Sequence, residues 1–226
     1  MLRDIERVIV QFRDPVLWRI VLKGIAATVV LLVATVAVLA VVVDLLVATG
    51  IGWLDPVLPW LTGLGGVVAA VFLLPVVTVA VLGLFVDEVA ARVEALNYPQ
   101  LPPGEPASLL TGVLLTMKLL GVTLALNLLA LPLYLLLPGA NIVIFLALNG
   151  YLLSREYVEA VAQRRMAPRE IVRLRRAHRG RFLAAGVVLA GLALVPLANL
   201  LLPVAGTALM VHRLAGLPEI ARGAPA

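Results

Sequence analysis

Apolar and polar residues follow one another in long blocks along this chain, and the blocks predict helices. Residues 2–13 place apolar side chains at helical spacing on one face and charged side chains elsewhere, which is typical of a helix lying at a membrane surface. Asp14 followed by Pro15 is typical of an N-cap and a first helical residue, so a new helix is predicted to begin there. The run 24–43 then has 20 residues without a charge, about 30 Å of helix and enough to cross a bilayer.

A second charge-free run of 30 residues covers 57–86, so 15–44 and 56–94 are predicted to be two long transmembrane helices. A cleaved signal peptide is the alternative for the first run, but its apolar core would have only about 7–15 residues. The segment 97–106 contains four prolines in ten residues, which excludes a helix and predicts an extended loop.

The two remaining apolar blocks, 107–160 and 182–214, are interrupted by residues that break helices. These residues are Pro132, Pro138 and Gly139 in the first block, and Pro196 and Pro203 in the second. The break at 138–139 leaves arms of 19 and 14 residues, and the second block is left with arms of about 14 and 8. Arms this short predict two re-entrant helical hairpins, whose irregular backbone must be buried in protein or line a wet cavity. Four to six ordinary, kinked spans are the alternative.

Composition places these helices in a membrane. The chain has 226 residues, of which 62% are hydrophobic and 14% charged, and its mean hydropathy is +1.09. Soluble domains have about 45–50% apolar and about 25% charged residues. The sequence therefore predicts an all-α integral membrane protein with a single domain over 1–226. It has no cysteine, which excludes disulfides and thiolate chemistry.

Basic residues set the predicted orientation. Eight arginines lie between the two predicted hairpins: Arg164, Arg165, Arg169, Arg173, Arg175, Arg176, Arg179 and Arg181. The segment 164–181 is predicted to be an Arg-rich cytoplasmic helix with a helix start at Pro168, and both chain termini are predicted to be cytoplasmic too. Three interpretations of the arginines stay open: a determinant of topology, a surface for anionic lipid headgroups, or a funnel for a small anion. A nucleic-acid surface is not expected, because no aromatic residues interleave the basic run.

Residues for enzymatic chemistry are nearly absent from the sequence. It has two serines and two histidines, no nucleophile motif, no metal-ligand spacing and no phosphate-binding glycine loop, so no catalytic residue, metal or cofactor is predicted. Polar side chains beside or within apolar runs are the better candidates, since charged groups in a membrane are costly unless they face a cavity or partner. Arg19 and Lys23 at the first helix entrance, together with Lys118 and Asn199, are the candidate anion-binding residues. A lysine reaching the headgroups and an asparagine joining two helices are the alternatives for the last two.

Several short motifs together resemble one family. They are Asn-Tyr-Pro at 97–99, the stretch 149–157, His-Arg-Gly at 178–180 and, most specifically, the closing block Val-Pro-Leu-Ala-Asn-Leu-Leu-Leu-Pro-Val-Ala-Gly-Thr-Ala-Leu-Met-Val at 195–211. They resemble the CysZ-like sulfate transporter family, also called the etoposide-induced-protein domain. The resemblance implies a bacterial inner-membrane protein with two long transmembrane helices and two partly penetrating hairpins. It also implies a homo-oligomer that takes up sulfate for cysteine synthesis without a nucleotide-binding subunit.

One motif differs from that family. Its sulfate-transporting members tend to carry Gly-Leu-Arg before the first long span, whereas this chain reads Pro-Val-Leu-Trp-Arg at 15–19. The expected function is movement of a small anion, with sulfate as the first candidate, passively or down an ion gradient. The alternative is a membrane scaffold that transports nothing and uses the Arg-rich helix to bind lipid or a partner.

Overall fold

The computed structural model describes residues 1–46, 85–106 and 109–221, together with the single positions 60, 63, 65 and 81. Within these residues every regular element is a helix, in agreement with the all-α prediction. The chain divides into two compact units, one comprising Met1–Trp18 and Val86–Ala226, the other Arg19–Phe85. Most of the predicted second long span, 56–94, lies outside the described residues.

Helices α1 (Leu2–Gln11) and α2 (Pro15–Leu46) are separated at Asp14. The backbone N–H of Val16 donates to Asp14 Oδ1 at 2.8 Å, and Pro15 takes the first helical position, so the predicted helix start is confirmed. Trp18 Nε1 donates to the carbonyl of Phe12 at 2.6 Å, which ties the first turn of α2 back to the end of α1. The segment Pro15–Val38 of α2 is long and apolar enough to cross a bilayer.

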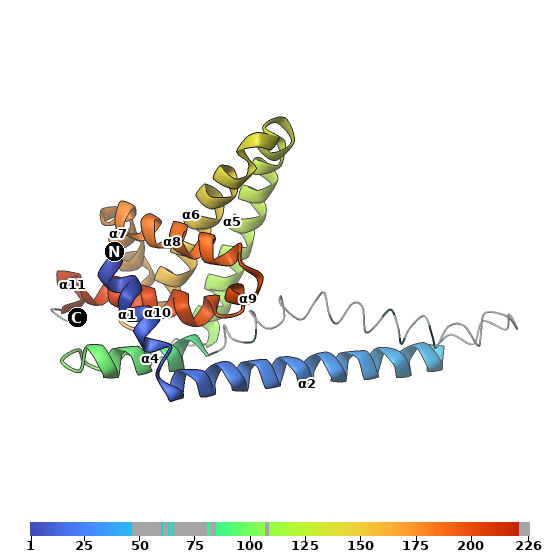
Figure 1. Cartoon of the computed structure of the whole chain (residues 1–226). Coiled ribbons are helices and arrows are strands. Elements are labelled where there is room, and N and C mark those ends of the chain that lie inside the picture. The colour runs from blue at the N-terminus through green and yellow to red at the C-terminus, as the bar shows by residue number, and fades with distance from the viewer. Residues whose placement is uncertain are drawn as a thin grey trace, which may run out of the picture. The chain divides into compact units, whose positions relative to one another are not determined.

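Helices α5 (Leu109–Leu136) and α6 (Asn141–Ala162) form a hairpin whose turn is the short 3-10 helix η1 (Pro138–Ala140), where the sequence places a break (Figure 1). A second stretch long and apolar enough to cross a bilayer, Met117–Leu136, lies in α5, and only 6% of it is buried. Pro132 was expected to interrupt the block, but this prediction is wrong because α5 continues through it. A proline removes one hydrogen bond of the helix, and in a long apolar helix the turns on either side persist.

The second interrupted block forms α8 (Arg179–Ala193), the short α9 (Pro196–Asn199) and α10 (Leu202–Ala215), followed by α11 (Pro218–Ala221). The expectation of an arm of about eight residues after Pro203 is wrong, since α10 has 14 residues. Pro203 lies in the first turn of α10, where a missing N–H breaks no hydrogen bond of the helix. The re-entrant path of both hairpins stays a prediction.

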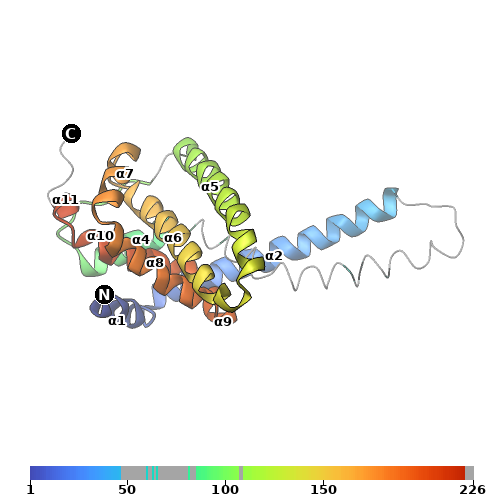
Figure 2. The ribbon, with the colours of Figure 1, turned by 90° about the horizontal axis from the view of Figure 1, so that it is seen from above.

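Glycines let α6 and α8 approach very closely (Figure 2). A Cβ atom on Gly186 would overlap the carbonyl oxygen of Gly150, and a Cβ on Gly150 would lie 2.8 Å from Cγ2 of Val187. No larger side chain fits either position without moving the backbone. Small residues at such a crossing are typical of helix packing in membranes, where dispersion contacts between backbones replace the hydrophobic effect.

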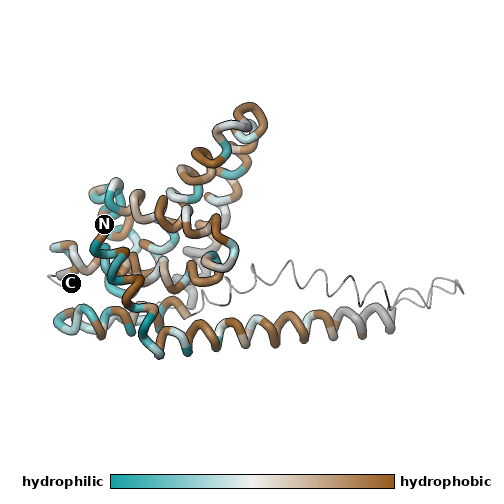
Figure 3. Tube along the Cα trace, in the orientation of Figure 1, coloured by the Kyte–Doolittle hydropathy of each residue, from teal (hydrophilic) through white to brown (hydrophobic). Residues whose placement is uncertain are grey.

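The core of the larger unit is built around α10, whose side chains are buried from Leu202 to Leu214. It packs against α1, α6, α8 and α4 (Val86–Asn97). Gly206 faces the ring of Tyr157 on α6, where an added Cβ would be 2.6 Å from the ring atoms. Figure 3 shows the outward arms of α5 and α6 as largely apolar, while polar residues gather at the opposite end of this unit.

Candidate functional site

The start of α2 carries the first pair of predicted anion-binding residues. Arg19 and Lys23 are one turn apart, so they lie on the same face of α2, and both are exposed. Neither forms an ion pair with another described residue. Two exposed cations one turn apart near the start of an apolar helix, without an ion pair to any described residue, can attract an anion and donate hydrogen bonds to it.

The backbone N–H of Val16 at that helix start is already occupied. Asp14 accepts the N–H of Val16, and its carboxylate also receives Nε of Arg92 on α4 at 2.7 Å and Nη2 at 3.3 Å. The hydrogen bonds from Arg92 hold the pKa of Asp14 below its ordinary value. An external anion therefore meets the protein's own carboxylate at the first turn, and positive charge becomes available one turn further on.

Lys118 and Asn199 lie in different elements and are not joined by a hydrogen bond. Lys118 is exposed on α5, at the beginning of the apolar stretch Met117–Leu136. Asn199 is half-buried at the end of α9, where its backbone N–H donates to the carbonyl of Val195 at 2.8 Å. Their assignment to a pore stays a prediction.

The arginine run is divided among three structural positions. Helix α7 covers only Pro168–Ala177, so the single helix expected over 164–181 is interrupted. Pro168 starts α7 as predicted, and the Glu170 carboxylate accepts the N–H of Ala167 at 2.9 Å. Arg164 and Arg165 lie in the turn before α7. Arg179 and Arg181 already belong to α8, because a distorted backbone at His178 separates the two helices.

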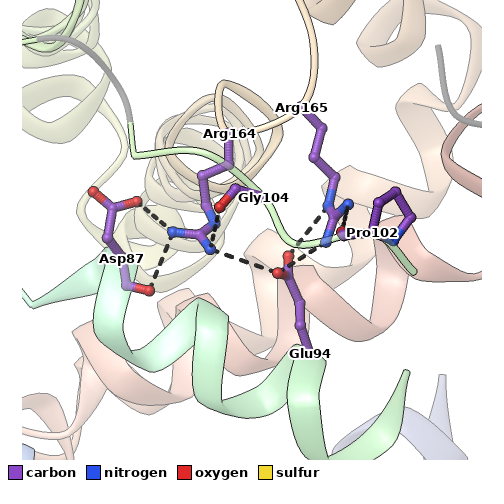
Figure 4. Close-up of polar contacts among 6 residues, drawn as sticks. All are labelled: Asp87, Glu94, Pro102, Gly104, Arg164 and Arg165. Carbon is purple, nitrogen blue, oxygen red and sulfur yellow. Dashed lines mark hydrogen bonds and ion pairs between the residues drawn. The ribbon is translucent and has the colours of Figure 1, made fainter. Parts of the chain in front are cut away.

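Arg164 and Arg165 bind the proline-rich loop to α4 (Figure 4). Arg164 is only 5% exposed, and its Nη1 lies 2.8 Å from Asp87 Oδ1 and 3.2 Å from the Asp87 carbonyl. Arg165 Nη2 lies 2.9 Å from Glu94 Oε2, and Nη2 of Arg164 lies 3.5 Å from the same oxygen.

The same two guanidiniums also bind backbone carbonyls of the loop. Arg165 donates to Pro102 and Arg164 to Gly104, while the N–H of Glu105 donates to the Arg164 carbonyl at 2.9 Å. A Cβ on Gly104 would lie 3.1 Å from Arg164 Nε, so glycine leaves room for the guanidinium. Arg164 is thus buried and Arg165 half-buried, and both guanidiniums are bound by carboxylates and loop carbonyls, while their assignment to a lipid or anion surface stays a prediction.

A second buried ion pair group lies on α6. Glu159 accepts Nε of Arg155 at 3.0 Å and Nη1 of Arg175 at 2.6 Å, both through Oε1. Arg155 and Glu159 are almost fully buried, and Arg175 comes from α7. This arrangement holds α7 against α6, since Ile171 and Leu174 of α7 are also buried.

The amino-terminal helix is attached through polar contacts with the end of α10. Arg213 Nη1 lies 3.3 Å from Asp4 Oδ2, and the hydroxyl of Tyr98 lies 2.9 Å from His212 Nδ1. Arg7 donates to the same hydroxyl at 3.2 Å. Burial, reinforced by the nearby Arg7, lowers the pKa of His212 to about 4, so this imidazole is neutral at physiological pH.

A small depression adjoins the Glu94–Arg165 pair. Apolar side chains of α6, α10 and α11 form most of its lining, which includes Val161, Leu214 and Ile220. Its enclosed space is about what one water molecule needs. Among the described residues no group of three or more histidines and carboxylates could hold a metal ion.

Sequence reasoning missed the acidic partners of the arginines. Asp87, Glu94 and Glu159 are contributed by two different helices, and two of them pair with cations more than 70 positions away. The available signal was the scarcity of acidic residues, since the sequence has 13 of them and 18 lysines and arginines. An acidic residue beside an apolar block was therefore a candidate ion-pair partner.

These features define an all-helical membrane protein, with outward apolar helices and a polar end held by buried ion pairs. The chain belongs to the family described as Sulfate transporter CysZ/Etoposide-induced protein 2.4, which it matches over residues 5–203. Its resemblance to that family is therefore confirmed, and the family is one of sulfate-transporter-like membrane proteins, not enzymes. No curated protein and no solved structure gives a match.

Proposed function

We propose that this protein moves a small inorganic anion across the bacterial inner membrane, with sulfate as the substrate and uptake as the direction. The main observation behind the proposal is that Arg19 and Lys23 are exposed, and form no ion pair with a described residue, at the beginning of an apolar helix long enough to cross a bilayer. The description of the family as a sulfate transporter supports the choice of substrate. A planar guanidinium donates two parallel hydrogen bonds, which suits a tetrahedral oxyanion.

The proposal includes a topology and an assembly. Both termini, the proline-rich loop and α7 face the cytoplasm, because the basic residues concentrate there. The protein acts as a homo-oligomer, and Lys118 and Asn199 face the pathway of the anion. No nucleotide-binding loop occurs in the sequence, so transport is passive or driven by an ion gradient.

Flux of radiolabelled sulfate into proteoliposomes without nucleotide tests the proposal. The sulfate flux of wild type is expected to exceed that of empty vesicles. In the double variant Arg19→Gln/Lys23→Gln the flux is expected to fall at least about tenfold, because each charge-assisted hydrogen bond contributes about 1.5–3 kcal/mol. The matched control Arg169→Gln/Arg173→Gln removes the same charge from exposed positions on α7 and should retain the flux.

Two results would contradict the proposal in different ways. Wild-type flux equal to that of empty vesicles would exclude transport and favour the alternative of a membrane scaffold. Flux that survives the Arg19→Gln/Lys23→Gln change would leave transport intact but exclude this pair as the binding residues. The charge-keeping variant Arg19→Lys/Lys23→Arg separates loss of charge from loss of fold, because it should retain most of the flux.

A further inference from the structure

The structure sorts the arginines of the basic run into two groups. Arg164, Arg165 and Arg175 are bound to carboxylates. Four others are exposed and form no ion pair with any described residue: Arg169, Arg173, Arg176 and Arg179. We call these four the free arginine face. The first three recur at intervals of four and three, so they lie on one side of α7.

Helix α7 presents the first three of these arginines in a fixed orientation, and Arg179 begins α8. Its opposite side buries Ile171 and Leu174, and Arg175 is held by Glu159 at 2.6 Å. The one acid of α7, Glu170, is already engaged by the backbone N–H at the helix start. Among the described residues, no ion pair therefore joins any of the four cations of the free arginine face to a carboxylate; the nearby Glu219 carboxylate lies 3.1 Å from His178 Nε2.

The chain continues directly from these cations into an exposed apolar surface. Arg179, Leu183 and Val187 lie at successive intervals of four along α8, so they form one ridge. Leu183 is 42% exposed, and Val187, which also packs against Gly150 of α6, is 36% exposed, whereas Phe182, Ala185 and Leu189 are buried against the protein. Figure 3 shows this change from polar α7 to more apolar α8.

Cations followed within one turn by outward apolar side chains match the layering of a bilayer surface, with charged headgroups above hydrocarbon. We propose that the free arginine face binds the phosphates of anionic phospholipids, and that α8 enters the acyl layer beside them. A free oxyanion would need the cations but not the apolar ridge, so the ridge favours lipid. This inference does not depend on sulfate transport.

The experiment uses full-length protein in vesicles of phosphatidylcholine with a minor fraction of phosphatidylglycerol. Spin-labelled phosphatidylglycerol and phosphatidylcholine report, by the motionally restricted fraction of each label, which lipid is enriched at the protein. Wild type is expected to enrich phosphatidylglycerol several-fold. The variant Arg169→Gln/Arg173→Gln/Arg176→Gln/Arg179→Gln should lower the enrichment at least about threefold, because basic residues near the surface act independently.

The matched control replaces the same four arginines by lysine, which keeps the charge, and is expected to retain most of the enrichment. All four side chains are exposed, so thermal unfolding of the variants should match wild type and show that the fold is intact. Enrichment unchanged in the glutamine variant would overturn the proposal, as would an equal loss in the lysine variant. Displacement of the labelled lipid by soluble glycerol phosphate at constant ionic strength would also overturn it, because the face would then bind free anions.

Discussion

Helices α10 and α5 are both rich in leucine, yet they face opposite surroundings. Every side chain of α10 from Leu202 to Leu214 is buried in protein. In α5 only 6% of the stretch Met117–Leu136 is buried. Apolar content alone therefore does not tell whether a helix of a membrane protein packs against protein or faces lipid, since both are apolar solvents for its side chains.

The difference between them lies in the small and polar residues. Gly206 lets the Tyr157 ring approach α10, and His212 and Arg213 at its end bind Tyr98 and Asp4. In α5, Gly121 has no described atom within 4 Å of the position of a Cβ, and Asn127 donates to the carbonyl of Thr123 in its own helix. Close approach and polar contacts to other elements identify the helix that packs against protein.

The largest effect is expected from a pair of glycine substitutions. In Gly206→Val the new Cβ would lie 2.6 Å from the Tyr157 ring, which is itself buried and cannot move away. We expect the free energy of unfolding to fall by at least about 3 kcal/mol, or the variant not to fold, because overpacking in a rigid core forces the backbone apart. Thermal unfolding in detergent measures it. Gly121→Val in α5 is the matched control, and equal destabilisation of the two variants would contradict the comparison.

Two leucine-to-alanine substitutions test the difference between α10 and α5 without adding a larger side chain. Leu209 on α10 is 2% exposed and Leu128 on α5 is 69% exposed. Leu209→Ala is expected to lower the free energy of unfolding by about 2–5 kcal/mol, while Leu128→Ala should change it by less than about 0.5 kcal/mol in detergent. Denaturant unfolding of both variants under the same conditions gives the difference. A similar loss in Leu128→Ala would mean that α5 packs against protein, for example in an oligomer.

Sequence reasoning worked where local chemistry decides. Pro15 and Pro168 start helices because a proline lacks only an N–H that a first turn does not use. Pro138 acts on the residue before it: Leu137 has a non-helical backbone, so α5 ends there. The same rule explains the error at Pro203, which was taken as a break although it lies in the first turn of α10. Whether a proline begins or interrupts a helix depends on where the preceding turn ends.

The candidate site was less predictable, because its contacts join distant parts of the chain. Arg164 and Arg169 look alike in the sequence, yet one is buried beside Asp87 and Glu94 and the other is exposed. Helical periodicity could group the arginines of α7 but could not identify carboxylates on α4. The spacing of four places Arg19 and Lys23 on one face of α2, where both are exposed, and their role in binding an anion stays a prediction.

A pH effect of intermediate size is expected from the polar end of α10, which lies outside the two apolar spans. Unfolded, His212 binds a proton near pH 6.5, but folded it does so only near 4, so stability is full above pH 6.5 and falls as the pH drops toward 4. The free energy of unfolding should fall by roughly 1–3 kcal/mol over this pH range. His212→Gln keeps an acceptor for Tyr98 and cannot titrate, so its unfolding temperature should change less between pH 7.5 and pH 5. Equal slopes for both proteins would exclude His212 as the titrating group.

The smallest effect should be a gain in α5. Gly121→Ala adds a methyl group where no described atom lies within 4 Å. Because alanine restricts the unfolded chain more than glycine does, the free energy of unfolding should rise by about 0.5–1 kcal/mol. Thermal unfolding in detergent would show a slightly higher midpoint. Gly206→Ala on α10 has the same gain in helix propensity but meets the Tyr157 ring, so its midpoint should fall. If Gly121→Ala also lowered the midpoint, α5 would have a close partner, and its outward face would be a protein contact.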